Sequence, residues 1–277
     1  MINSDSELAA QFWEKGRLDD CPIIDFHGHM GENRSLYLPR KDPEGMLRTM
    51  DQCNVQLLFF CSHESLFVSA LHRSVDIEAV RANPDRFRSY FGLNANFPYL
   101  EKDLEQLRQN PDVFIGLKML PSYFACPIND DRYTPFYEYA DEKNLLFLCH
   151  TWGGDTFCGV EETETFLKRF PNVIFIAGHA LFGEWERAGR LAKKYSNFYL
   201  DTCAVMQKRG GIEILVRECG SEKILFGTDI PWFDPHQAIG DLLSAEITDE
   251  DRLNILNRNG VRLLKRYEWF QKIRPGL

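Results

Sequence analysis

The chain has 277 residues, of which 44% are hydrophobic and 26% are charged, a composition typical of soluble globular proteins and not of disordered or fibrous ones. Its 41 acidic residues outnumber the 32 basic ones, and a net charge of −9 argues against nucleic acid as a partner. The longest apolar runs, such as residues 55–61 (VQLLFFC), are far shorter than the ~20 residues that a bilayer-spanning helix needs. A membrane protein is therefore not expected.

Several features predict a cytoplasmic protein of one domain. The first 18 residues carry Asp5, Glu7 and Glu14 and lack the basic and apolar regions of a signal peptide. The eight cysteines contain no CxxC pair and are interpreted as reduced thiols. No Gly-, Ser- or Pro-rich stretch marks a linker, so we expect a single domain over residues 1–277, with an N-terminal helical extension over residues 1–20.

Short apolar runs alternate with helix-like segments along the whole chain. After an amphipathic segment at Ser6–Lys15, the predicted strands are Pro22–Phe26, Val55–Cys61, Arg88–Leu93, Val113–Met119, Leu145–His150, Val173–Gly178, Phe198–Asp201 and Ile224–Gly227. The predicted helices are Asp42–Gln52, Ser65–Arg81, Leu100–Gln109, Thr134–Lys143, Val160–Phe170, Gly183–Lys194, Ile212–Cys219 and Asp249–Lys265. Eight such repeats in about 250 residues are typical of a (β/α)8 TIM barrel. The alternative, a doubly wound sheet, is disfavoured because no GxGxxG or GxxxxGK[ST] loop follows the first strand.

Polar residues gather where the predicted strands end, which is where such barrels place their active sites. His27 and His29 follow the first run, and because strand side chains alternate, both imidazoles point the same way. His150, His179 and Asp229 follow the fifth, sixth and eighth runs. One histidine alone is more often a packed or solvated residue, but four histidines at strand ends together predict a metal site.

These residues lie in motifs that resemble the amidohydrolase superfamily, in its amidohydrolase-related branch. The resemblance rests on DFHGHM at 25–30, GLKMLP at 116–121, LCHTWGG at 148–154, LFGTDIPW at 225–232 and ILNRNGVRLL at 255–264. It implies a distorted (β/α)8 barrel that binds one divalent metal, usually zinc and alternatively manganese, through the ligands His27, His29, His150 and Asp229. It also implies that His179 or Asp229 moves the proton.

Lys118 ends the fourth run, where binuclear members of the superfamily carry a carboxylated lysine that bridges two metals. We favour an unmodified lysine that binds a substrate carboxylate or a nearby acid, and a binuclear site is the alternative. Arg34, Tyr37, Trp152 and Trp232 are the other candidate substrate-binding residues. His63 could face the pocket or cap a helix, and Asp201 could bond a ligand or a helix end.

The resemblance predicts a metal-dependent hydrolase that uses a metal-activated water on a small carboxylated or cyclic ester or amide. The alternative on the same metal site is a lyase, either a nonoxidative decarboxylase or a hydratase. A noncatalytic metal-binding barrel is the rival from another functional class. A small molecule is the expected partner, and a homodimer is plausible because barrels of this size often pair.

Overall fold

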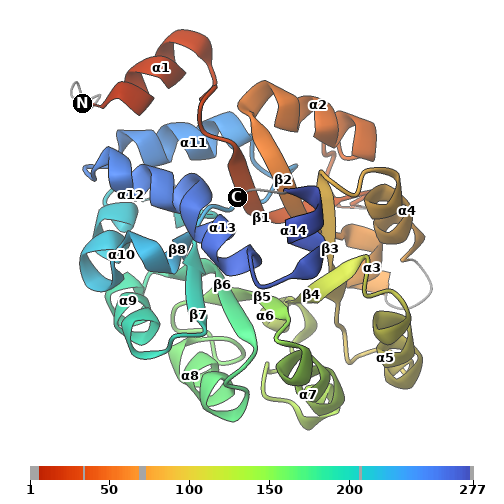
Figure 1. Cartoon of the computed structure of the whole chain (residues 1–277). Coiled ribbons are helices and arrows are strands. Elements are labelled where there is room, and N and C mark those ends of the chain that lie inside the picture. Colours follow the sequence, from red (N-terminus) through yellow and green to blue (C-terminus); the bar gives the residue numbers. More distant parts are fainter. Residues whose placement is uncertain (1–5, 34, 69–72, 206–207, 275–277) are drawn as a thin grey trace.

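Eight parallel strands form one sheet whose order follows the sequence (Figure 1). The computed structural model describes residues 6–33, 35–68, 73–205 and 208–274. The strands are β1 Ile23–Met30, β2 Val55–Ser62, β3 Phe87–Gly92, β4 Phe114–Met119, β5 Leu146–Trp152, β6 Ile174–Phe182, β7 Phe198–Asp201 and β8 Ile224–Leu225. All eight are rich in buried apolar residues, as parallel strands covered on both faces must be.

The sheet curls until its last segment meets its first strand. β8 is short, but the extended chain after it bonds to β1: the amide of Phe26 donates to the Phe226 carbonyl at 2.9 Å, and that of Asp229 donates to the His27 carbonyl at 2.7 Å. A further parallel bridge joins Gly28 to Ile230. The fold is therefore a nearly closed TIM barrel, and the sequence-based prediction of this architecture is confirmed.

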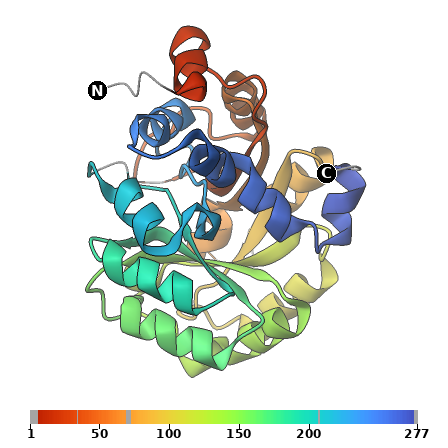
Figure 2. The same cartoon turned by 60° about the vertical axis from the view of Figure 1, so that its left-hand side comes forward.

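Helices surround the sheet as an outer layer (Figures 1 and 2). They are α1 Glu7–Lys15, α2 Pro43–Cys53, α3 His63–Val68, α4 Ser74–Ala82, α5 Leu100–Gln109, α6 Pro121–Phe124, α7 Thr134–Lys143, α8 Val160–Arg169, α9 Trp185–Lys194, α10 Gly211–Cys219, α11 Pro235–Ser244, α12 Asp249–Leu253, α13 Asn259–Leu264 and α14 Glu268–Ile273. Local chemistry sets many of their ends. In α1, for example, the Ser6 hydroxyl accepts from the Ala9 amide, and Gly16 ends the helix with a φ of 74°.

One predicted helix, Ser65–Arg81, is wrong, because the structure divides this region into α3 and α4. The physical reason is Arg73, which precedes α4 and is buried with its guanidinium 3.6 Å from the centre of the Phe91 ring. Arg73 also donates to the Gly92 carbonyl and pairs with Asp103 at 3.1 Å. Residue 73 is thereby held against β3 and α5 and cannot continue a helix on the outer surface.

Three helices were not predicted, namely α6, α11 and α14, and the predicted closing helix contains a π-helical turn at Asn254–Arg258 between α12 and α13.

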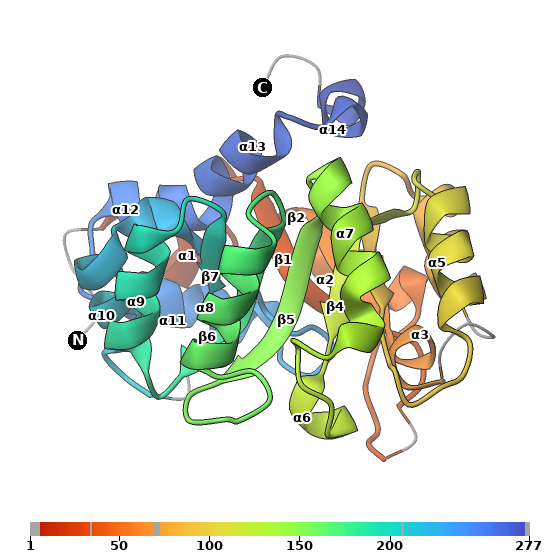
Figure 3. The same ribbon diagram turned by 90° about the horizontal axis from the view of Figure 1, so that it is seen from below.

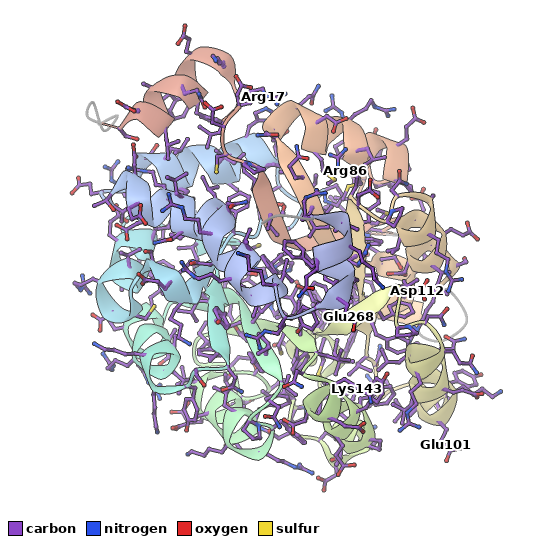
Figure 4. The ribbon with its side chains drawn as sticks, in the orientation of Figure 1. Arg17, Arg86, Glu101, Asp112, Lys143 and Glu268 are labelled. Atoms are coloured by element: carbon purple, nitrogen blue, oxygen red, sulfur yellow. The ribbon has the colours of Figure 1, made fainter. Side chains whose placement is uncertain are left out.

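α14 lies at the end of the barrel where the strands begin, whereas α6 lies at the opposite end (Figure 3). Trp269 of α14 packs there against Arg88 and Phe59. The labelled Arg86, Asp112 and Lys143 lie just before the beginnings of β3, β4 and β5 (Figure 4). α14 therefore covers the end of the barrel where the strands begin, and the carboxyl ends of the strands lie at the opposite end (Figure 3).

All eight cysteines are free thiols, and seven of them are buried. None of the helices in the described part of the chain is long and apolar enough to cross a membrane.

Candidate metal centre and active site

The carboxyl ends of the strands surround a cavity of about 730 Å³ that is partly open to solvent. Its floor is polar and contains residues contributed by five strand ends, and its walls are mostly apolar and aromatic. The floor residues are His27, His29, Lys118, His150, His179 and Asp229, and the wall residues include Leu66, Phe67, Leu120, Tyr123, Trp152, Trp232 and Phe233. This combination of a polar floor and aromatic walls is common for small-molecule sites.

The two histidines of β1 direct lone pairs toward the same place. Nδ1 of His27 lies 2.7 Å from Oδ2 of Asp201, and Nδ1 of His29 lies 3.0 Å from the Cys61 carbonyl oxygen. A carbonyl accepts only, and the Asp201 carboxylate in its ionised form does likewise, so each Nδ1 carries the hydrogen and each Nε2 keeps a lone pair. Burial and the charge of Lys118 lower the pKa of His27 well below its usual value, which keeps this imidazole neutral.

Asp229 lies opposite these lone pairs. Its Oδ1 is 3.2 Å from Nε2 of His29 and 3.6 Å from Nε2 of His27, yet among the described residues none donates a hydrogen bond to this buried oxygen. The buried Lys118 ammonium attracts this carboxylate, and that attraction favours the ionised form of Asp229. These three acceptors share no hydrogen with one another, although Nε2 of His27 also faces the Lys118 ammonium. A divalent cation satisfies such a set, and the residues therefore fit a metal.

The positive charge that the structure does place here belongs to Lys118. Its side chain is fully buried, and its Nζ lies 2.9 Å from Nε2 of His27. Burial lowers the pKa of Lys118, whereas the nearby carboxylates of Asp229 and Asp201 oppose that shift. The ammonium and a metal ion would compete for one lone pair, that of His27 Nε2.

His150 and His179 form the other side of the floor, with Nδ1 of His150 2.9 Å from Nε2 of His179. Burial lowers the pKa of His150 well below its usual value, and burial together with His27 lowers that of His179 to about 4. Within the described ranges no group bonds to the buried Nδ1 of His179. This nitrogen is available to a substrate, a water molecule or a metal.

An unusual backbone at the end of β6 directs His179 into the cavity. His179, Ala180 and Leu181 all adopt left-handed φ angles of 67°, 50° and 51°, which cost energy for residues other than glycine. Thr151 of β5 supports the turn, because its hydroxyl donates to the Gly178 carbonyl at 2.7 Å and accepts from the Leu181 amide at 3.1 Å. Asp229 is left-handed too, with φ 66°. Such strain commonly marks functional sites.

Two further carboxylates lie beneath the floor. Burial raises the pKa of both Asp25 and Asp201 to about 7. Asp25 accepts from the amides of His27 and Thr228 and from the Thr228 hydroxyl, so it joins β1 to the chain after β8. Asp201 instead contacts the His27 ring.

The predicted substrate-binding residues fall into three groups. Trp152 and Trp232 line the cavity, as does Lys118. Tyr37 does not: it is 82% exposed and is absent from the cavity lining, because the loop after β1 leaves its ring in solvent near the Lys41 ammonium. Arg34 lies outside the described residues.

Other residues of the site were left open or missed by the sequence analysis. His63 faces the cavity, where it stacks on His29, donates from Nδ1 to the Gly31 carbonyl and accepts from the Trp232 indole at 3.0 Å. Cys203 was missed. One ligand atom each from His27, His179, Cys203 and Asp229 lies within 4.8 Å of the others, so a buried His/Cys/Asp cluster could hold a metal ion. The signal was the sequence LDTC at the seventh strand end, where Asp201 and Cys203 are two residues apart.

This tight cluster shares His27 and Asp229 with the predicted ligand set, but it does not include His29 and His150. The structure brings all four predicted ligands to the floor of one cavity. Which of these donors bind the metal stays a prediction.

A comparison with protein families decides the relationship. The sequence model of the family described as Amidohydrolase matches residues 24–266. The chain belongs to this amidohydrolase family. The match begins in β1 and ends after α13, so it includes every residue of the cavity floor.

Solved structures similar to this amidohydrolase support the fold. An uncharacterised TIM-barrel protein from Bordetella bronchiseptica has a TM-score of 0.74 at 18% identity, covering 88% of this chain and 98% of its own. A dihydroxybenzoic acid decarboxylase from a Polaromonas species, with bound manganese and the inhibitor 2-nitroresorcinol, has a TM-score of 0.65 at 19% identity, covering 90% and 99%. A 4-oxalomesaconate hydratase from Rhodopseudomonas palustris has a TM-score of 0.64 at 17% identity, covering 90% and 98%. No curated protein matches the sequence of this chain.

Proposed function

We propose that this amidohydrolase-family protein is a metal-dependent lyase that releases carbon dioxide from a small, flat aromatic acid. The observation that supports the proposal most directly is the geometry of the cavity, in which a cluster of potential metal ligands and a buried lysine lie beneath aromatic walls. A ring can lie against Phe67, Tyr123, Trp152 and Trp232 while its carboxylate reaches the floor. The similar decarboxylase with manganese and a resorcinol inhibitor, and the similar hydratase, favour this reading over the hydrolase expected first from sequence.

His27, His29, His150 and Asp229 would hold the metal, with Cys203 and His179 as the further donors within reach. When bound, a divalent ion acts as a Lewis acid that draws electron density from a carboxylate or an adjacent oxygen of the substrate. The Lys118 ammonium would pair with the substrate's negative charge. The half-exposed Trp232, held by the hydrogen bond from its indole to His63, would cover one side of the ring.

Decarboxylation breaks the bond between the ring carbon and the carboxylate. The electron pair stays on the ring carbon, carbon dioxide leaves, and that carbon takes up one proton. His179 is placed to relay this proton from solvent to the ring carbon, because its Nδ1 has no partner among the described groups and its Nε2 contacts His150. Asp229 is the other acid–base group on the cavity floor that could move a proton.

Hydrolysis is the second candidate, and the state of His179 favours it. Burial first, and then His27, lowers the pKa of His179 to about 4, so at neutral pH the imidazole is a base that can take a proton from water. This is the role that the sequence analysis assigned to it, and it applies equally to hydration.

The experiment that separates these reactions is product analysis after loading with zinc or manganese. We expect metal-dependent release of carbon dioxide from dihydroxybenzoates, equal in amount to the decarboxylated phenol, and at least about 100-fold slower release per bound metal by His179→Gln. Turnover of esters, lactones or amides by the loaded protein without any carbon dioxide release would contradict the lyase and establish the hydrolase instead.

A further inference from the structure

We infer that Asp201 is a positioning residue, whose carboxylate fixes the His27 ring in the tautomer that can bind a metal and at the same time holds the backbone of His179. The inference rests on the proposed metal centre but not on the reaction that this centre performs. It goes beyond the proposed function because it assigns a role to a residue that neither lines the cavity nor is a proposed ligand.

The contacts of Asp201 lead to the site from two sides. Asp201 is the last residue of β7 and is completely buried. Its Oδ2 lies 2.7 Å from Nδ1 of His27, and its Oδ1 accepts from the amides of His179 at 2.7 Å and Cys203 at 3.1 Å. One carboxylate therefore connects a candidate ligand on β1 with the proton-transfer histidine at the end of β6.

The hydrogen-bond chain through His27 determines its tautomer. With the hydrogen on Nδ1, the ring donates to Asp201, and Nε2 accepts from the Lys118 ammonium at 2.9 Å. The opposite tautomer would leave Asp201 facing a lone pair and would direct an Nε2–H at a group that is itself a donor. This tautomer leaves a lone pair on Nε2, which faces the Lys118 ammonium and lies 3.6 Å from Oδ1 of Asp229. Carboxylates of this kind, behind metal-binding histidines, raise ligand basicity and fix ring orientation.

An asparagine at position 201 would reverse this arrangement. In the wild type the backbone amides of His179 and Cys203 both donate to one oxygen of Asp201. If the single side-chain oxygen of the asparagine takes that place, its NH2 group faces Nδ1 of His27. The NH2 group can only donate, so the ring hydrogen must move to Nε2. Nε2 would then have no lone pair for a metal, although the size and packing of the side chain hardly change.

Asp25 provides a matched control. It is equally buried and also bonds to His27, but to the backbone amide at 3.0 Å and not to the ring. Asp25→Asn therefore disturbs a neighbouring carboxylate network of similar kind without presenting a donor to Nδ1. A loss of metal binding that arises merely from a weakened strand end should occur in both variants.

The test combines two measurements. The first determines the ring tautomer of His27 in the metal-free protein by two-bond ¹H–¹⁵N correlation, with the signals assigned through their loss in His27→Gln. The second measures zinc affinity by competition with a chelator. We expect the Nδ1–H form in the wild type and in Asp25→Asn, the Nε2–H form in Asp201→Asn, and zinc affinity reduced about 10- to 100-fold in Asp201→Asn alone.

A wild-type His27 with its hydrogen on Nε2 would overturn the inference, and this result needs no variant to fold. An Asp201→Asn protein that binds zinc as tightly as the wild type would overturn it as well. Failure of the wild type to bind zinc at all would instead contradict the proposed metal centre, and the tautomer measurement would still decide the role of Asp201.

Discussion

At the scale of single residues, the charge of Lys118 is the feature that most affects the chemistry of the site. It is the single lysine or arginine among the described residues that line the cavity, and it faces Nε2 of His27. An unmodified ammonium repels a divalent ion and can bind a substrate carboxylate. A carboxylated lysine would instead be a ligand for a second metal.

Replacing Lys118 with methionine distinguishes these two states. If the lysine is unmodified, removing its charge and its hydrogen bond to His27 should raise zinc affinity at neutral pH by at least about tenfold, since unit charges about 4 Å apart interact by about 4 kcal/mol at an effective dielectric constant of 20. The substrate KM should rise because the partner of its carboxylate is gone. Titration calorimetry with zinc and steady-state kinetics measure the two effects. A fall from two metals per chain to one would show that Lys118 bridges a binuclear site.

At the scale of elements, the paired ends of β5 and β6 position His179. The Thr151 hydroxyl makes two hydrogen bonds to the β6 end, and the three residues after Gly178 are left-handed. Backbone strain of this kind persists only where the surrounding structure holds the residues in place. The position of the His179 ring therefore depends on a residue that does not itself reach the cavity.

Thr151→Val keeps the shape of the side chain but removes both hydrogen bonds. We expect it to lower the free energy of unfolding by about 1–3 kcal/mol and to reduce kcat about 10- to 100-fold because the His179 ring shifts. Denaturant unfolding and steady-state kinetics provide the measurement. Thr151→Ser retains the hydroxyl and should stay close to the wild type, and equal losses of kcat in the serine and valine variants would refute this account of the turn.

The buried pair of Arg73 and Asp103 explains why the predicted helix 65–81 is divided, and it should be worth measurable stability. Both side chains are almost completely buried. Arg73→Met removes this buried ion pair and the hydrogen bond of Arg73 to the Gly92 carbonyl, and it should cost about 3–5 kcal/mol of unfolding free energy. The exposed pair of Arg81 and Asp112 serves as the control, since Arg81→Met should leave stability nearly unchanged. Similar losses in chemical denaturation for both variants would mean that Arg73 is not a structural anchor.

The strands could be predicted from sequence more fully than the helices and the site. Short apolar runs such as Val55–Ser62 specify strands by themselves, and the alternation of His27 and His29 places both on one face. The division at Arg73 depends on Phe91 and Asp103, which are distant in sequence, so spacing could not show it. α11 did carry a local signal, since Asp234 caps it and Pro235 begins it. The sequence LDTC placed Asp201 and Cys203 together at a strand end, but their contacts with His27 and His179, like the contact of His63 with Trp232, depend on side-chain directions between distant segments.

At the scale of the whole molecule, stability and chemistry are separated at the two ends of the barrel. α14 covers the end where the strands begin, and the cavity lies at the end where they finish (Figure 3). Changes at one end should therefore leave the other largely unaffected.

Trp269→Ala tests this separation. The indole packs on the Arg88 guanidinium at 4.4 Å and on Phe59, so its loss should lower the unfolding free energy by about 2–4 kcal/mol. Zinc affinity and kcat should match those of the wild type when both are measured well below the melting temperature. A large loss of zinc binding in the folded variant would show that the two ends are coupled.

The central claim is that the strand ends of this amidohydrolase-family barrel bind a metal. Elemental analysis of protein purified without a metal-chelating tag and reconstituted with zinc or manganese tests it most directly, with His27→Ala measured alongside. We predict about one metal per wild-type chain and almost none in the variant, while both remain folded by circular dichroism. No bound metal in the reconstituted wild type, or equal metal in both proteins, would contradict the account.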